Sequence, residues 1–168
     1  RYTDAAARIW DKDRIFLYRG DGVADLARLL RSCGLRIGFE AARVSHAFAR
    51  ALSHAAPGLA LEAADGLVEE LRVIKDADEI AALRASFRLN HAMLDGVRDV
   101  LVPGRTELEV SWDIERYFRE HGASELAFAN IVAVGPNAAL PHAIPGSDRI
   151  GENCPVLLDI GCRVQDYC

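Results

Sequence analysis

The sequence lacks the signals of several protein classes. It has no cluster of Lys and Arg, and its formal net charge of −5 disfavours non-specific binding of nucleic acid. None of its apolar runs approaches the length of about 20 residues that a membrane helix needs. A Gly-rich phosphate loop, a nucleophile elbow and an HExxH motif are also missing. We therefore expect neither nucleic acid nor a membrane as a partner.

Cysteine is scarce and scattered. Cys33, Cys154, Cys162 and Cys168 show neither CxxC spacing nor the spacing of a zinc finger. Such a pattern is typical of free thiols in a reducing compartment, which predicts a cytoplasmic protein. A hydrophobic content of 51% with 27% charged residues then indicates an ordinary globular fold.

The first section of the chain, residues 1–64, alternates strand and helix patterns. The patterns predict a strand over 14–18, a helix over 24–32, a strand over 35–39 and a helix over 45–55. Strand-helix-strand-helix order is typical of an α/β layer. A linker over 65–75 follows, and residues 76–168 form the second section.

The second section begins with two amphipathic helices. Asp76 with Glu79, and Thr106 with Glu109, are two capping boxes, which predict helices over 76–101 and 106–121. We expect the first helix to bury the stripe formed by Ile80, Leu83, Phe87, Leu94, Val97 and Leu101. We expect the second to bury Val110, Ile114, Tyr117 and Phe118. Strands are predicted over 126–134 and 155–164, which makes the fold class α+β.

Two residues of the second section could carry chemistry. His142 lies in a loop that Pro141 and Pro145 stiffen, and rigid loops at strand ends often carry functional groups. Asp159 lies inside an apolar run that reads as a buried strand, where an unpaired carboxylate would cost several kcal/mol. It either bonds backbone amides beside Gly161 in a structural role or ligates a divalent cation. The residue pattern alone favours neither role.

Several motifs together resemble those of one superfamily. The segment VIKDADEI (73–80) resembles the opening of the catalytic domain of Xaa-Pro peptidases, and GPNAALPH (135–142) resembles their GPNSALPH loop. The segments LLDIG (157–161) and DYC (166–168) resemble a pair of their strands, while RYT (1–3) and IGFE (37–40) resemble marks of their N-terminal domain. The chain is therefore similar to the creatinase / prolidase / methionine aminopeptidase superfamily, which has the pita-bread fold.

The resemblance implies a specific architecture and activity. Residues 1–64 would be the C-terminal part of a creatinase-type N-terminal domain, and residues 76–168 the first half of a pita-bread catalytic domain. Family members hydrolyse the bond before proline with two divalent metal ions, which would be Mn, Co or Zn. Asp159 matches the first of five metal ligands, and His142 matches a histidine that contacts the substrate. The resemblance also implies a homodimer.

Two alternatives remain open from the sequence. One is a pita-bread protein that binds other molecules without catalysis, and the other is a creatinase-type hydrolase that uses no metal. Because the other four ligands would lie beyond Cys168, we expect a polypeptide of these 168 residues alone to be inactive. Ala143 and Ile160 depart mildly from the family pattern and leave the substrate preference open.

Overall fold

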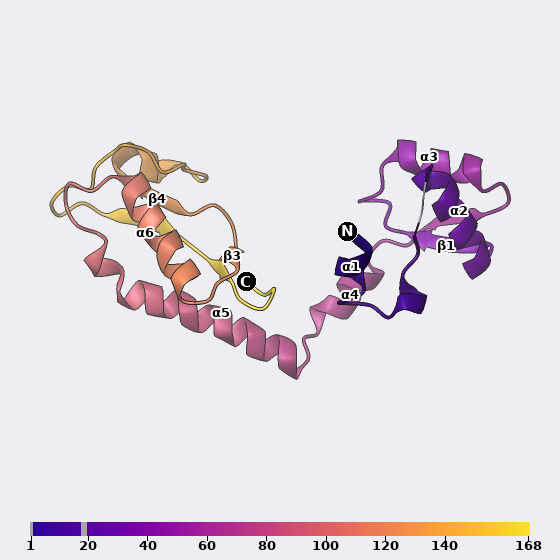
Figure 1. The fold of residues 1–168 in the computed structure, drawn as a ribbon. Helices are drawn as coiled ribbons and strands as arrows, with labels where there is room; N and C mark the ends of the chain where they lie inside the picture. Colours follow the sequence, from indigo (N-terminus) through magenta and orange to yellow (C-terminus); the bar gives the residue numbers. More distant parts are fainter. Residues whose placement is uncertain (1, 18–19) are drawn as a thin grey trace. The chain divides into compact units, whose positions relative to one another are not determined.

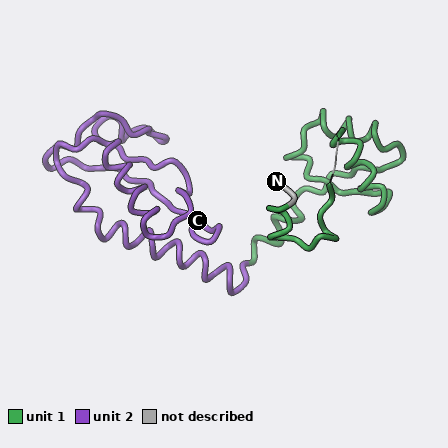
Figure 2. Tube along the Cα trace, in the orientation of Figure 1, with its two compact units in different colours: residues 1–74 green, residues 75–168 purple. Residues whose placement is uncertain are grey.

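A computed structural model describes residues 2–17 and 20–168 and divides the chain into two compact units, residues 1–74 and 75–168 (Figures 1 and 2). Both units mix helices and strands, which confirms the α+β class. No helix among the described residues is long and apolar enough to cross a membrane.

The first unit is built around a short parallel strand pair. Its elements are α1 (Tyr2–Ala6), η1 (Lys12–Arg14), α2 (Gly22–Cys33), β1 (Arg36–Phe39), α3 (His46–Ala55), β2 (Ala60–Ala63) and α4 (Leu67–Val73). β1 pairs with β2 in parallel, with α3 as the crossover between them. The core contains Ala27, Leu52, Ala56 and Leu59. The helix α4 lies within the segment expected as a linker.

The helix starts of this unit follow their capping residues. The Asp21 side chain accepts hydrogen bonds from the backbone of Val23 and Ala24 at the start of α2. Ser45 caps α3 by accepting from the backbone N–H of Phe48. The predicted helices over 24–32 and 45–55 and the predicted strand over 35–39 therefore correspond to α2, α3 and β1 to within a few residues, whereas α1, β2 and α4 were not predicted.

The strand predicted over 14–18 is wrong for the residues that the structure describes. Arg14 ends the 3-10 helix η1, and residues 15–17 are irregular, while Tyr18 lies outside the described residues, as does Arg1 of the RYT motif. A strand needs a hydrogen-bonded neighbour, and in the described part of the unit β1 and β2 pair with each other alone.

The second unit places two helices against four short strands (Figure 1). Its elements are α5 (Ala77–Asp95), η2 (Val97–Asp99), α6 (Glu107–Glu120), β3 (Glu125–Leu126), β4 (Ile131–Val134), η3 (Gly135–Ala139), β5 (Val156–Asp159) and β6 (Cys162–Arg163). Both predicted capping boxes are present. Val110, Ile114 and Phe118 of α6 are fully buried, as expected, against Met93, Val132 and Cys162.

The first long helix differs from its prediction in length and in its buried face. α5 ends at Asp95 because Gly96 follows, and glycine in a helix interior costs about 1 kcal/mol relative to alanine. Ile80, Phe87 and Leu94 are exposed, which contradicts half of the expected stripe. The other half is partly buried: Leu83 is half-buried, and Val97 and Leu101, which follow α5, pack against the core. The buried positions are Ala82, Ser86 and Met93.

The small residues of α5 face inward because a strand lies close to them. Ser86 Oγ donates a hydrogen bond of 2.9 Å to the carbonyl oxygen of Cys162 in β6. Close packing at this point leaves no room for a large side chain, so α5 turns the face that carries Ala82 and Ser86 toward the strand.

Each predicted long strand is broken into two. β4 pairs with β5 and β3 pairs with β6, both antiparallel, and the breaks fall at residues 127–130 and 160–161. The two breaks face each other, since the Ala127 N–H donates to the Gly161 carbonyl oxygen at 2.9 Å. A Cβ placed on Gly161 would lie 3.0 Å from the Ala127 Cβ, so glycine permits the close approach of the two segments here.

Candidate functional site

The two predicted site residues line one pocket of about 630 Å³ in the second unit. His142 enters it from the loop after η3, and Asp159 from the last position of β5. The remaining lining comes from two segments, Phe128–Ile131 and Ala143–Pro145. A mainly apolar pocket with a few polar groups is the usual form of a small-molecule or peptide site.

The position of Asp159 corrects one expectation. The β5 residues alternate between half-buried and exposed, and Asp159 is on the exposed side, opposite Ile131 of β4. Val156 and Leu158 take the inward positions because side chains alternate along a strand. The carboxylate is therefore accessible in the pocket rather than buried in a strand interior.

His142 is also exposed, on a loop that is fixed nearby. Pro136 stands in the first turn of η3, and the neighbouring Ala143 is only 4% exposed. Pro141 and Pro145 restrict the backbone on either side of the histidine. The imidazole thus projects from a loop that has few conformations.

The other histidines of the chain, and two acidic residues near the strands, lie outside this pocket. His46, His54, His91 and His121 are exposed, and His121 Nδ1 lies 2.8 Å from the Tyr117 carbonyl oxygen at the end of α6. Asp166 lies in a turn with a φ of 64°. Glu125 forms an ion pair with Arg163 across β3 and β6 at 2.9 Å.

A buried carboxylate beneath the His142 loop escaped the sequence reasoning. Glu107, the first residue of α6, is 0% exposed. Its Oε1 accepts from the Val134 N–H at 2.7 Å, and its Oε2 accepts from Asn137 Nδ2 at 2.7 Å and the Gly146 N–H at 2.8 Å. An acidic residue in a first helical turn is ordinary, so no local signal distinguishes Glu107.

Asn130, which lines the pocket, is another buried residue that the sequence did not single out. It is 4% exposed, and its Nδ2 donates to the Ser111 carbonyl oxygen at 3.4 Å. The amide ties the segment before β4 to α6. It therefore helps to hold the lining segment Phe128–Ile131 in place.

The described residues do not by themselves form a metal site. Nowhere in the described ranges do three or more His, Cys, Asp or Glu side chains gather closely enough to hold an ion. Asp159 alone offers one carboxylate, whereas stable sites need several ligands. Any metal chemistry requires ligands beyond those described.

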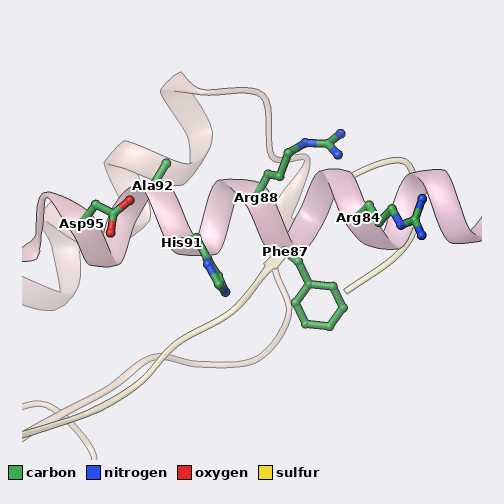
Figure 3. Close-up of a pocket in the computed structure, with 6 residues that line it drawn as sticks. All are labelled: Arg84, Phe87, Arg88, His91, Ala92 and Asp95. Atoms are coloured by element: carbon green, nitrogen blue, oxygen red, sulfur yellow. The ribbon is translucent and has the colours of Figure 1, made fainter.

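A second hollow, of about 460 Å³, lies along the exposed side of α5 (Figure 3). Its six lining residues, Arg84, Phe87, Arg88, His91, Ala92 and Asp95, all come from this one helix. Side chains from a single helix face do not converge on a ligand as groups from several elements do. The His142 pocket is the better candidate site.

Family models match both parts of the chain. Residues 81–168 match the model of metallopeptidase family M24, and residues 1–74 match the creatinase/prolidase N-terminal domain. The fold is therefore that of the pita-bread peptidases. The chain belongs to metallopeptidase family M24.

Solved structures of peptidases are similar to the chain. A Xaa-Pro dipeptidase from Bacillus anthracis has a TM-score of 0.87 and 29% identity, covering 96% of this chain and 45% of its own. An X-Pro aminopeptidase from Thermotoga maritima has a TM-score of 0.84 and 27% identity, covering 97% of this chain and 47% of its own.

Sequence relatives agree with these structures. An uncharacterized peptidase of Bacillus subtilis, YqhT, is 28% identical over all of this chain and 48% of its own length. An uncharacterized peptidase of Staphylococcus aureus is 36% identical over 62% of this chain and 30% of its own length. The chain thus spans less than half the length of these relatives.

Proposed function

We propose that the protein hydrolyses the peptide bond before proline, in Xaa-Pro dipeptides or at the N-termini of longer peptides. The observation that carries the proposal is the shared pocket of His142 and Asp159, each in the motif context of the family. The Xaa-Pro dipeptidase and the X-Pro aminopeptidase among the similar structures support the substrate class.

The pocket suits a prolyl peptide. Phe128, Ile131, Ile144 and Pro145 offer apolar surface against which the pyrrolidine ring can pack. The tertiary amide of proline has no N–H to satisfy, so an apolar wall beside it leaves no unpaired donor. The polar side chains of His142 and Asp159, which line the same pocket, can then orient the scissile carbonyl.

We assign His142 to the substrate. Its imidazole can donate a hydrogen bond to the carbonyl oxygen and to the charge that develops there during attack, where removing one donor typically costs 10²- to 10³-fold in kcat. A stiff loop holds that donor in place without reorganisation at the moment of reaction.

We assign Asp159 to a metal centre. Its accessible carboxylate would supply one ligand of a site for two divalent ions, Mn, Co or Zn, completed by residues outside this chain. Such ions activate water and polarise carbonyls. We further propose a homodimer, on the basis of the family resemblance, and a cytoplasmic location, on the basis of the scattered cysteines.

The test of the proposal is hydrolysis of Xaa-Pro dipeptides and Xaa-Pro-Xaa peptides by the protein as its gene encodes it. We expect turnover with proline and little with alanine in its place. His142→Ala should lower kcat by about 10²-fold or more, while His91→Ala, on the exposed side of α5 (Figure 3), should not. Equal rates on proline and alanine peptides, or full activity of His142→Ala, would exclude the proposal.

A further inference from the structure

The strongest unassigned feature of the second unit is the buried side chain of Glu107. Two carboxylate oxygens accept three hydrogen bonds, and the three donors belong to residues 27, 30 and 39 positions further along the chain. Burying such a group costs several kcal/mol unless its oxygens are fully bonded. Here each oxygen accepts at least one hydrogen bond, and all three donors belong to one segment.

That segment is the loop that carries His142, which we define as residues 134–146. Val134 and Gly146 are its two ends, and both donate their backbone N–H to Glu107. Asn137 connects the interior, because its Nδ2 donates both to Glu107 Oε2 and, at 3.2 Å, to the Ile144 carbonyl oxygen. His142 therefore lies within a closed set of bonds centred on one carboxylate.

The start of α6 holds the same loop through its backbone. The Leu108 N–H donates to the carbonyl oxygen of Gly146, the last loop residue, at 3.1 Å, and the Glu107 N–H donates to the carbonyl oxygen of Asp148, two residues beyond the loop, at 3.0 Å. These donors are among the first N–H groups of the helix, which have no partner within it. The loop thus rests on the N-terminus of α6 at both the main chain and the side chain.

Helix capping does not explain the side chain. Thr106 and Glu109 already form a complete capping box at this end of α6. Glu109 is exposed, whereas Glu107 turns inward to the loop. The carboxylate of Glu107 is therefore available for another purpose.

We propose that Glu107 is a positioning residue for His142: it holds both ends of the 134–146 loop and Asn137 so that the imidazole faces the pocket. This inference deepens the proposed function and rests on it for the role of His142. Glu107 does not contact the substrate, and it acts only through the loop. Misplacement of a substrate-positioning group by about 1 Å can cost on the order of 10²-fold in rate.

The first test is a double-mutant cycle in the protein as its gene encodes it, measured on an Xaa-Pro dipeptide. Glu107→Gln keeps the volume but sets an amide N–H against a donor of the loop. We expect kcat to fall by about 10- to 100-fold with a much smaller change in KM. In a His142→Ala background the same change should have almost no further effect, because non-additivity marks residues that act together.

The matched control is Glu109→Gln. It weakens the same helix start by removing the carboxylate from the capping box, yet it does not touch the loop. We expect it to be nearly neutral in kcat. If Glu107 contributed only to stability, Glu107→Gln and Glu109→Gln would have equal activity when compared at an equal loss of unfolding free energy. That result would overturn the inference.

The second test needs no catalysis. Amide hydrogen exchange should show faster exchange at Val134 and Gly146 in Glu107→Gln, with unchanged protection in the α6 interior. Asn137→Ala, a milder change at a half-buried position, should loosen the loop partially and serves if Glu107→Gln does not fold. Unchanged exchange at both loop ends in both variants would overturn the inference.

The two proposals fail in different ways. Full activity of His142→Ala would contradict the proposed function and, with it, the role of Glu107 in catalysis. The hydrogen-exchange experiment would still show whether Glu107 holds the loop. A strong effect of His142→Ala with a fully additive effect of Glu107→Gln would overturn the positioning role alone.

Discussion

At the scale of single residues, the site depends on small and buried groups that flank the two obvious ones. His142 and Asp159 are exposed in the pocket, whereas Glu107, whose side chain holds the loop of His142, is buried. Gly161 permits the close approach of Ala127 and Phe128, and Phe128 lines the pocket. The geometry of the site is therefore sensitive to residues without any chemistry of their own.

Gly161→Ala tests this dependence. The added Cβ would lie 3.0 Å from the Ala127 Cβ and 3.1 Å from the Phe128 ring, so the ring must move. We expect a loss of about 1–3 kcal/mol in the free energy of unfolding, as for other overpacked sites, and a raised KM. Urea unfolding and steady-state kinetics measure both. Gly151→Ala, where the nearest atoms are 3.8 Å away, is the control, and equal effects at the two glycines would contradict the account.

Which site residues the sequence could reveal follows from the range of their contacts. His142 and Asp159 stand in recognisable local motifs, so their presence in one pocket is understandable from the sequence. Glu107 could not be found, because its three partners come from a distant loop and an acid at a helix start is common. The exposure of Asp159 could not be read from its apolar neighbours, because strand phase decides which side each residue faces.

At the scale of elements, local contacts determine where α5 begins, and tertiary contacts determine which of its faces is buried. Its capping box is a contact over three residues, and the sequence predicts it correctly. Half of its buried face was predicted wrongly, because the exposed large apolar residues occupy one side of the helix and the small residues Ala82 and Ser86 the other. The contact with β6 requires small side chains on the facing side of the helix. The spacing of apolar residues in the sequence does not reveal this contact.

The start of α5 is also tied to the end of the chain. Glu79 completes the capping box through its Oε2, which accepts from the Asp76 N–H at 2.8 Å. Its Oε1 accepts from the Tyr167 hydroxyl at 2.6 Å. The Tyr167 hydrogen bond, and then the Asp76 backbone bond, lower the pKa of the Glu79 carboxyl below its usual value.

This arrangement predicts a pH dependence with a definite sign. A lowered pKa in the folded state means that the stabilisation is complete above the unfolded value of about 4.3 and is lost as the pH falls through the folded pKa. We expect Tyr167→Phe to reduce the unfolding free energy near neutral pH and to make its decline below about pH 5 shallower.

Urea unfolding of the wild type and Tyr167→Phe at a series of pH values measures this effect. Tyr117→Phe, on α6 in the same unit, is the control and should keep the wild-type pH profile. Parallel profiles for the wild type and Tyr167→Phe would contradict the role of the Glu79 carboxylate.

At the scale of the whole molecule, the described residues form two hydrophobic cores, each drawn from one unit. Leu52 belongs to the core of residues 1–74, and Ile114 to that of residues 75–168. The longer helices α2, α3, α5 and α6 were predictable from amphipathic patterns and caps. The breaks in the long strands were not, because they lie where the segments of Gly161 and Ala127 approach each other closely.

Truncation of each core predicts effects local to it. Leu52→Ala and Ile114→Ala should each cost about 2–5 kcal/mol in local stability. Native-state hydrogen exchange should show the loss of protection in residues 1–74 for the first variant and in residues 75–168 for the second. Loss of protection in both units from either change would contradict the assignment of two separate cores.

We propose that the accessible carboxylate of Asp159 belongs to a metallopeptidase centre. The most direct measurement is the divalent metal content of the purified protein as its gene encodes it, compared with Asp159→Ala and with Asp166→Ala as a control. We predict two ions per chain in the wild type and in Asp166→Ala, and the loss of at least one in Asp159→Ala. A wild type without divalent ions, or an Asp159→Ala variant that keeps both, would contradict the account.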